Sequence, residues 1–471
     1  MKRSTSPTEK EREEISTTPS APSSSSTTTK RQKQTEKDDG EDSCVYIDAS
    51  TVNQRHFFDD IISKRRPAVI RNCALDILAP LWATRKKDPS NKPSGPFCSR
   101  PNLEQRAGDA EVDIDVKTKD KGFGHGNLKK MSFSDFCRHT DESSDFYLTT
   151  QPIAVDEQDR PHILSQPLLD YCRNAEIGSP GQVPFMPPEL QLMNVNLWIG
   201  RTSKPTSSRF HHDYHDNVYF LLKGRKRFRL SSYKHAKKLP TGGILAKVHD
   251  NGRIVCAEQE PVREDGAPLV AAELLQLSVR LAQIQQDLED CSCESKREDL
   301  ENELENILQR QLELEADDEE GGFGDGASGS DESSDEEEDA EFAGFKFGNE
   351  NDGDKKPSAD EDSKKPPSKT TGKERVLNFC QFDSIEAERK GIPVQEVELG
   401  AGDVLYLPAG WYHEVFSSGS SYNGKDTDTI ADGWHPDVHM ALNYWYFPPN
   451  SGSTLEKPYH DDFWKNSNEQ A

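Results

Sequence analysis

The sequence is poor in apolar residues and lacks any long run of them. Only 32% of its 471 residues are hydrophobic, whereas a compact globular domain has about 45–50%. No apolar segment approaches the ~18–20 residues that a membrane-spanning helix needs. The sequence therefore predicts that the chain does not cross a membrane and that its hydrophobic core is confined to part of the chain.

A cysteine framework and a secretory signal are also missing. The nine cysteines are an odd number and are scattered along the chain, which suits a reducing compartment better than a disulfide scaffold. The amino terminus is charged but lacks the apolar stretch of a signal peptide. We expect a soluble protein of the cytoplasm, the nucleus or both.

Positive charge is scarce. The chain has 58 Lys and Arg residues against 84 Asp and Glu residues, a formal net charge of −26. Such a chain is a poor general binder of nucleic-acid backbones, and no DNA-binding module is evident. The pair Lys2 and Arg3, with the basic segment 30–33, could form a split nuclear-import signal or a solvated patch; both interpretations stay open.

Composition divides the chain into structured and unstructured parts. Residues 1–43 contain no aromatic residue, and residues 317–362 hold 19 acidic residues and 3 lysines. Segments of this kind cannot bury enough apolar surface to fold. We therefore expect a disordered tail 1–43, a discontinuous globular domain 44–262 plus 373–449, an inserted helical region 263–316, a disordered acidic linker 317–372 and a C-terminal tail 450–471.

Alternating apolar and polar residues predict strands before and after the inserted region. In the segment 191–200, Val195, Leu197 and Ile199 fall on one face, as in a half-buried strand. A short helix is expected at 54–63. The other expected strands are 66–72, two strands within 217–230 that meet at Lys223 and Gly224, 376–382, two strands within 394–415, and 439–449.

The inserted region has helical periodicity. Leu274, Leu277, Leu281, Ile284 and Leu288 follow one another at spacings of three and four residues, which is a heptad seam. A second set continues after a break at Cys291–Ser295: Leu300, Leu304, Ile307 and Leu314. We predict a coiled-coil-like antiparallel hairpin. Two interpretations of its part 266–316 stay open: it serves packing or self-association, or it binds a partner.

The segment from Phe210 to Asn217 is rich in histidine and aspartate. If it is extended, His211 and Asp213 lie on one face and His212 on the other, because side chains alternate along a strand. A neutral imidazole beside a carboxylate offers two donors to a first-row metal ion. A polar turn at a strand end would give the same pattern, so both interpretations stay open at this point.

The following strand places a lysine inside the domain. Lys226, Phe228 and Leu230 share one face of the segment 225–230, and three arginines share the other. The two apolar residues indicate that the lysine face points inward. Because a buried ammonium costs several kcal/mol of desolvation, we expect a bound anion to pair with it. The alternative is a lysine that extends to solvent at the rim.

A third donor occurs far along the chain. His413 ends the segment 402–413, GDVLYLPAGWYH, beside large aromatic residues. In a barrel, a donor on a late strand can face donors on an early one. Two histidines and one carboxylate on one side of a metal ion form the facial triad of non-haem Fe(II) oxygenases.

These motifs together resemble a known family. The pattern His211-x-Asp213, Lys226 and GDVLYLPAGWYHEV followed by ALNYW resembles the Jumonji-C, or cupin-like, branch of Fe(II)- and 2-oxoglutarate-dependent oxygenases, most closely its small hydroxylase-type members. The likeness covers 44–262 and 373–449. It implies a mainly β, double-stranded β-helix (cupin or jelly-roll) fold with N-terminal α/β decoration, an inserted α-helical hairpin and disordered acidic segments.

The resemblance also implies roles for individual residues. By position, His211, Asp213 and His413 would be the catalytic iron ligands, and Lys226 would hold the distal carboxylate of 2-oxoglutarate. Four further residues match positions near the cosubstrate: Tyr147, Asn217, Asn443 and Ser208. The long insertions depart from the family pattern. How a substrate would reach the site past them stays open.

By the same resemblance, the expected activity is that of a dioxygenase that uses Fe(II), 2-oxoglutarate and O2. A protein side-chain hydroxylase is the first hypothesis, with a protein as substrate. One alternative is a lysine or arginine demethylase that acts on histones or other proteins by the same chemistry. The other is a catalytically silent cupin-like scaffold whose task is binding.

Overall fold

The computed structural model describes residues 42–82, 97–117, 127–156, 161–177, 181–321, 376–419 and 433–465. The predictions for the tail 1–43, the basic clusters within it and the acidic linker 317–372 fall almost wholly outside these residues. Within the described ranges, no helix has both the length and the apolar character that crossing a membrane requires.

Nine strands form the larger sheet. All neighbours in it pair antiparallel except β1 and β2 at its edge. The strands, in spatial order, are β1 (Val45–Ile47), β2 (Ala68–Ile70), β14 (Val404–Leu407), β9 (Asp216–Lys223), β16 (Val438–Tyr446), β6 (Leu192–Arg201), β5 (Phe146–Leu148), β3 (Glu111–Val116) and β4 (Leu128–Ser132).

A smaller antiparallel sheet contains the strands that carry most of the predicted site. Its order is β13 (Gln395–Gly400), β10 (Arg225–Ser231), β15 (Tyr412–Ser418) and β7 (Thr206–Ser207), and β8 (His211–His212) also pairs with β15. A separate two-stranded sheet joins β11 (Leu245–Val248) to β12 (Ile254–Cys256).

The two larger sheets pack face to face. One hydrophobic cluster takes Tyr219 and Leu221 from β9, Phe228 from β10 and Leu405 from β14, and so joins residues of both sheets. Alternation puts these side chains inside because successive residues of a strand point to opposite faces. The mainly β, jelly-roll-type architecture is confirmed.

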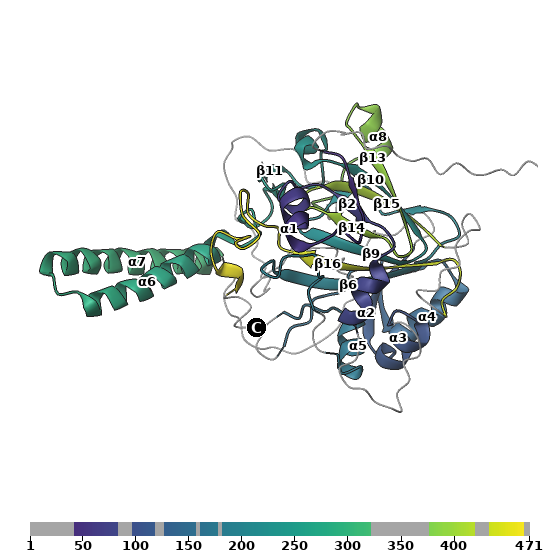
Figure 1. Cartoon of the computed structure of the whole chain (residues 1–471), viewed down its shortest axis with the longest axis horizontal. Coiled ribbons are helices and arrows are strands. Elements are labelled where there is room, and N and C mark those ends of the chain that lie inside the picture. Colours follow the sequence, from purple (N-terminus) through teal and green to yellow (C-terminus); the bar gives the residue numbers. More distant parts are fainter. Residues whose placement is uncertain are drawn as a thin grey trace, which may run out of the picture. The chain divides into compact units, whose positions relative to one another are not determined.

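Helices cover the other face of the larger sheet, as the N-terminal α/β decoration predicts. Val195, Leu197 and Ile199 of β6 point into a second cluster, which includes Phe136 and Leu168 from the helices. Figure 1 shows α2 to α5 gathered beside this sheet. The helices are α1 (Gln54–Phe57), continued by the π-helical turn Phe58–Ile62, α2 (Ala74–Leu81), α3 (Arg100–Ala107), α4 (Phe133–Glu142) and α5 (Leu168–Asn174).

The inserted region forms two long helices. α6 (Leu269–Asp290) and α7 (Glu294–Gly321) lie side by side and extend away from the sheets (Figure 1). Their shared cluster includes Ile284, Leu300 and Ile307 of the predicted heptad seam. Short elements complete the description, namely the 3-10 turn Tyr233–Lys238 and α8 (Ser384–Arg389).

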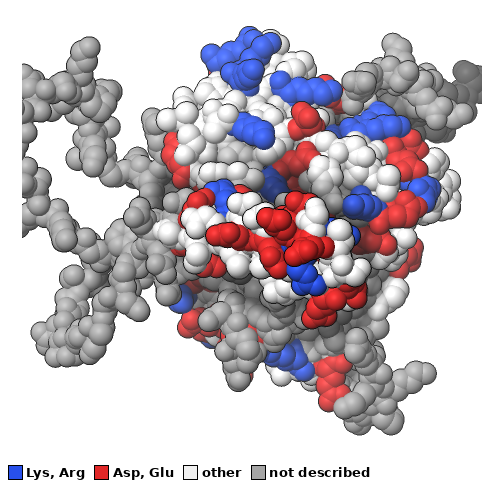
Figure 2. Space-filling model, turned by 90° about the vertical axis from the view of Figure 1, so that its left-hand side faces the viewer, with Lys and Arg blue, Asp and Glu red and all other residues white. Residues whose placement is uncertain are grey.

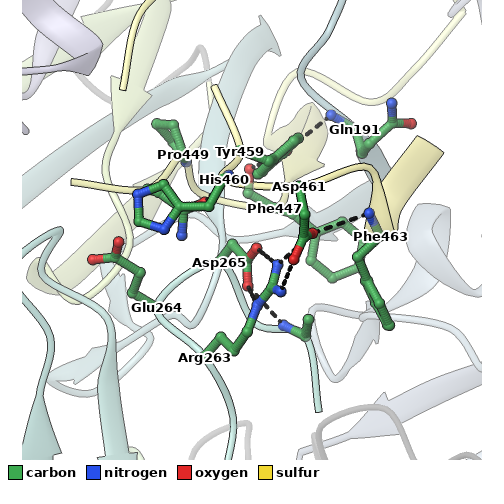
Figure 3. Close-up of polar contacts among 12 residues, drawn as sticks. Gln191, Arg263, Glu264, Asp265, Phe447, Pro449, Tyr459, His460, Asp461 and Phe463 are labelled. Carbon is green, nitrogen blue, oxygen red and sulfur yellow. Dashed lines mark hydrogen bonds and ion pairs between the residues drawn. The ribbon is translucent and has the colours of Figure 1, made fainter. Parts of the chain in front are cut away.

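The segment after Pro449 packs against the domain instead of leaving it. Tyr459 and Trp464 are buried, and the Tyr459 hydroxyl donates to the carbonyl of Phe447 at 2.9 Å. Arg263, just before α6, pairs with Asp461 at 2.6 Å. Figure 3 shows this arginine between Asp265 and Asp461. The C-terminal segment therefore helps to fix the base of the hairpin.

One expected strand is absent. Residues 376–382 form no strand in the structure and contribute only the isolated bridges His211–Phe379 and Thr241–Cys380. Their apolar residues make separate contacts instead of forming a ladder. Phe379 stacks on the His211 ring at 4.6 Å between centroids, and Cys380 and Phe382 pack in another hydrophobic cluster. The apolar composition of residues 376–382 did not distinguish a strand from an irregular segment that lies over His211. We call residues 376–382 the cover segment.

Candidate metal centre

Two paired strands bring the predicted donors together. His413 on β15 is the cross-strand partner of His211 on β8, and Asp213 follows β8 directly. One donor atom from each of these three residues can be chosen so that all lie within 4.8 Å of one another. His413 Nε2 lies 3.7 Å from Asp213 Oδ2. Donors about two hundred residues apart thus form a single cluster.

Backbone contacts orient both imidazole rings. His211 Nδ1 lies 2.9 Å from the carbonyl of Arg209, and His413 Nδ1 lies 3.0 Å from the carbonyl of Trp411. A carbonyl can only accept, so each Nδ1 carries the proton and each Nε2 keeps its lone pair. This is the tautomer that a metal-ligating histidine uses, with its other nitrogen fixed by a hydrogen bond.

The third donor is a carboxylate whose loop is fixed by a close approach. Gly410 donates its backbone N–H to the carbonyl of Asp213 at 2.9 Å. Gly410 has a φ of +78°, and a Cβ there would lie 1.8 Å from the carbonyl oxygen of Gly252. Only glycine fits this turn. The turn connects β14 to β15 and so fixes the approach of His413 to Asp213.

Burial shifts the pKa values of His211 and Asp213 toward their neutral forms. It lowers the pKa of His211 well below its ordinary value, and the neighbouring His413 lowers it further. Burial also raises the pKa of Asp213, although His413 and a hydrogen bond from Asn217 oppose that change. A divalent cation would reverse the balance for the carboxyl group by stabilising its charged form. Two imidazoles and one carboxylate in a buried place fit such an ion.

His212, by contrast, points away from the cluster. It is fully buried, and its ring makes edge contacts with Tyr214 and Tyr412 at centroid distances of 5.3 and 5.1 Å. The predicted alternation along the segment 211–213 is therefore observed.

A cavity of about 160 Å³ opens beside the three donors. Every residue predicted for the site contributes to its wall, from strands and connecting segments that are distant in sequence. These residues are Tyr147, Ser208, His211, Asp213, Asn217, Lys226, His413 and Asn443.

Lys226 faces this cavity, as the alternation of β10 predicts. Only 3% of its surface is exposed, and its Nζ donates to Ser417 Oγ at 2.5 Å. Within the described ranges it forms no ion pair with a carboxylate. Burial lowers its pKa to about 7. A buried ammonium without a carboxylate partner is a site for an anion, because attraction to the anion would offset the free energy lost by desolvation.

Two aromatic side chains approach each other near Lys226. Tyr147 on β5 and His439 on β16 lie on either side of Gly200, which is the cross-strand partner of both. Their ring centroids are 5.9 Å apart. A Cβ at Gly200 would lie 2.5 Å from Tyr147 Cδ2 and 2.9 Å from His439 Cε1, so the glycine permits the approach. The pKa of His439 is lowered well below its usual range by burial and then by the charge of Lys226.

Each of the two predicted asparagines has one buried side-chain atom without a hydrogen-bond partner among the described residues. Asn443 Oδ1 accepts from the indole N–H of Trp198 at 2.9 Å, whereas its buried Nδ2 has no partner among the described residues. Asn217 Oδ1 is likewise buried without a described partner. Ser208 Oγ accepts from the backbone N–H of Val415 at 3.0 Å and also faces the cavity. The two unpartnered atoms of the asparagines are buried, which indicates that a ligand or water completes their hydrogen bonding.

Sequence reasoning missed several parts of the cavity wall. Ser417 shares its strand face with His413 and Val415, so the two-residue alternation of β15 could have identified it. Asp115, Asn378 and Phe379 also line the cavity, but they reach it from β3 and from the cover segment. No local signal in the sequence points to them, because only the tertiary fold brings these segments to the site.

Comparisons with known proteins agree with this geometry. The sequence model of a family described as "cupin-like domain" matches residues 54–452. The chain is also 28% identical over 438 residues to a protein of Schizosaccharomyces pombe named "JmjC domain-containing protein 4", a match that covers 86% of this chain and 85% of that protein.

Proposed function

Because the chain belongs to the cupin-like domain family, we propose that it is an Fe(II)- and 2-oxoglutarate-dependent dioxygenase that hydroxylates a side chain of a protein substrate. The resemblance to Jumonji-C proteins that the motifs indicated is thus confirmed at the level of the family. The dioxygenase activity, its cosubstrate and its substrate class are the proposal.

One observation carries it. The cluster of His211, Asp213 and His413 and the buried, anion-seeking Lys226 lie in the wall of the same cavity. A metal site alone would suit many proteins, and a buried lysine alone would suit many anions. Their combination fits a ligand that chelates a metal ion at one end and carries a carboxylate at the other, as 2-oxoglutarate does.

The three donors would hold the iron through His211 Nε2, His413 Nε2 and a carboxylate oxygen of Asp213. When bound, Fe(II) supplies the oxidative decarboxylation of the keto acid and the hydroxylation of a C–H bond by O2. The carbonyls of Arg209 and Trp411 keep both imidazole lone pairs aimed at the ion. Three protein ligands leave positions open, which this chemistry requires.

Lys226 would bind the distal carboxylate of the cosubstrate by a charge-assisted hydrogen bond. Ser417 Oγ, which already accepts from Lys226 Nζ, orients the ammonium toward the cavity. Tyr147 lines the same wall, and its hydroxyl would be a second donor to that carboxylate. These residues set the length and direction of the molecule that the cavity accepts.

Apolar residues of the same wall would exclude water from the reaction. Phe228, Leu405 and Leu407 line the cavity between the two sheets and belong to the buried cluster there. A dry wall strengthens the pairing of Lys226 with its anion. It would also limit side reactions of water with reactive groups in the cavity.

The test is an assay of 2-oxoglutarate turnover with added Fe(II). We expect succinate release that His211→Ala abolishes, while Val279→Ala, at an exposed position outside the cavity, retains it. A protein of normal fold and iron content that releases no succinate would favour the binding scaffold and contradict the proposal. Formaldehyde release on methylated peptides would identify a demethylase and contradict the hydroxylation part alone.

A further inference from the structure

The helical hairpin carries exposed apolar side chains. Eight large apolar residues in the described part of the chain are exposed, and four of them lie on α6 and α7: Leu269, Val279, Leu308 and Leu312. Leu308 is 45% exposed and Leu312 is 62% exposed. They are four residues apart, so they adjoin on one face of α7. Single exposed leucines are common, but a concentration on one element needs an explanation.

The two flanks of the hairpin differ. With the seam at the a and d heptad positions, Glu273 and Arg280 of α6 and Glu303 and Arg310 of α7 fall at g positions. They form the pairs Arg280–Glu303 and Arg310–Glu273, each at 2.7 Å. We call this the closed flank, because its charges are paired between the helices.

The opposite side is the open flank, which consists of the e and b positions. Its centre is mainly apolar, with Ser278 and Gln285 as uncharged polar residues at e positions of α6, and every charged residue around that centre is an exposed glutamate. No lysine or arginine of residues 269–316 falls at these positions. The centre contains Ala271, Leu275, Ala282, Leu308 and Leu312, and the surrounding glutamates are Glu289, Glu294, Glu298, Glu301, Glu305 and Glu315.

Charge decides which occupant fits the open flank. Residues 269–316 hold twelve carboxylates and four basic side chains, a net charge of −8. Figure 2 views the molecule from the side toward which the hairpin points, and acidic side chains gather at the centre of that view. A second copy would bring the same six glutamates against these six, which is unfavourable. The acidic segment 317–362 of the chain itself has the same sign.

We propose that the open flank docks a basic amphipathic helix of a partner protein. The apolar face of that helix packs on Leu275, Leu308 and Leu312, and its lysines or arginines pair with the surrounding glutamates. This is recognition of a helix by an apolar strip with charged borders. The result is a three-helix arrangement in which the partner uses the e and b positions that the hairpin leaves open.

Contacts at the base of the hairpin attach it to the rest of the domain. Arg263 lies between Asp265 and Asp461 (Figure 3), and Gln276 of α6 donates to the same Asp461 at 2.8 Å. The hairpin is thus attached to the C-terminal segment, which itself packs on the domain. A partner held by the open flank is therefore held beside the domain. The proposal does not depend on the activity of the cavity.

The experiment uses the full chain and a displayed library of amphipathic helices about three heptads long. Leucine is fixed on one face of each helix, and the other positions vary among Lys, Glu, Gln and Ala. We expect selection to enrich helices rich in lysine. A labelled synthetic copy of an enriched helix then binds the full chain, and Leu308→Glu combined with Leu312→Glu weakens that binding by at least ~10-fold, about 1.4 kcal/mol.

This double substitution separates apolar docking from simple charge attraction. It adds two negative charges, so attraction of a basic peptide by charge alone would become stronger. Both leucines are exposed, so the hairpin is expected to keep its helices, which circular dichroism checks. Ile385→Glu on α8 is the matched control, because Ile385 is also 45% exposed and lies outside the hairpin; it should leave binding unchanged.

Three results would overturn the proposal. Selection could yield no helix or acidic helices, or the double substitution could leave binding undiminished. Sedimentation of the full chain gives the third: a dimer that the double substitution dissociates would assign the open flank to a second copy.

Discussion

The cavity between the sheets and the open flank of the hairpin depart from ordinary folding rules in opposite ways. In the cavity, polar groups are buried and incomplete: Lys226 has no carboxylate partner among the described residues, and Asn443 Nδ2 has no hydrogen bond there. On the open flank, Leu308 and Leu312 are exposed.

The difference indicates what each region would accept. A folded chain normally pairs its buried polar groups and buries its apolar ones. Unpaired polar groups inside a small cavity suit a small, charged ligand and a metal ion. Uncovered apolar groups on a long, rigid surface suit another macromolecule. The two regions are therefore expected to respond to different ligands and to substitutions independently.

The largest expected effect is at Lys226. Lys226→Met removes the only ammonium among the described residues that line the cavity, so affinity for 2-oxoglutarate should fall roughly 100-fold, about 3 kcal/mol. Iron binding should not change. The ligand-free variant should unfold at the same or a higher temperature, because a buried charge without a counter-charge is removed.

Titration calorimetry and thermal unfolding measure these quantities, with Lys226→Arg as the charge-retaining control. A Lys226→Met variant that keeps full affinity would show that the anion binds elsewhere.

The second effect concerns the hairpin alone. Ile284 is fully buried in the seam between α6 and α7, so Ile284→Ala should destabilise the hairpin by about 2 kcal/mol. Hydrogen exchange of the α6 amides should become roughly 30-fold faster, while the strands around the cavity keep their protection. Val279→Ala, at an exposed position of the same helix, should change stability by less than about 0.5 kcal/mol.

A loss of 2-oxoglutarate turnover in the Ile284→Ala variant would contradict the independence of the two regions.

The third effect is a pH dependence of the cavity. Burial lowers the pKa of Lys226 to about 7, so the ligand-free ammonium loses its proton as the pH rises through this value. The charged form binds the anion, and affinity for 2-oxoglutarate should therefore fall with rising pH, by up to ~10-fold for each unit above pH 7. His439, the titratable neighbour of Lys226, stays neutral here because its pKa is well below its usual range.

Binding of 2-oxoglutarate between about pH 6 and pH 9 measures this dependence. Lys226→Arg should give a flatter profile, because arginine stays protonated throughout. Identical slopes for the two proteins would assign the pH dependence to another group.

The smallest effect is expected from removing the hairpin. Deletion of 269–321 leaves residues 322–375 to connect the domain, and it removes only Ala272 from the main hydrophobic cluster. Turnover of 2-oxoglutarate without protein substrate should stay within about twofold. The deletion variant should bind no selected basic helix. Inactive or insoluble protein would show that the two regions depend on each other.

Sequence reasoning predicted the parts of the molecule that depend on local periodicity. Alternation located Lys226 inside β10 and separated His211 from His212, and heptad spacing located the seam through Ile284. It failed where only tertiary contacts decide. Asp115 reaches the cavity from a distant strand, and Phe379 lies over His211 from a segment that was expected to be a strand. His439 approaches Tyr147 because Gly200 leaves room, and no spacing in the sequence reveals that.

The central claim is that His211, Asp213 and His413 bind a ferrous ion whose cosubstrate is held by Lys226. Anaerobic titration of the full chain with Fe(II), with and without 2-oxoglutarate, tests it most directly. We predict saturation at one ion per chain, tighter binding when 2-oxoglutarate is present, and loss of the site in His413→Ala. Absence of saturable binding, or unchanged binding in His413→Ala, would contradict the account.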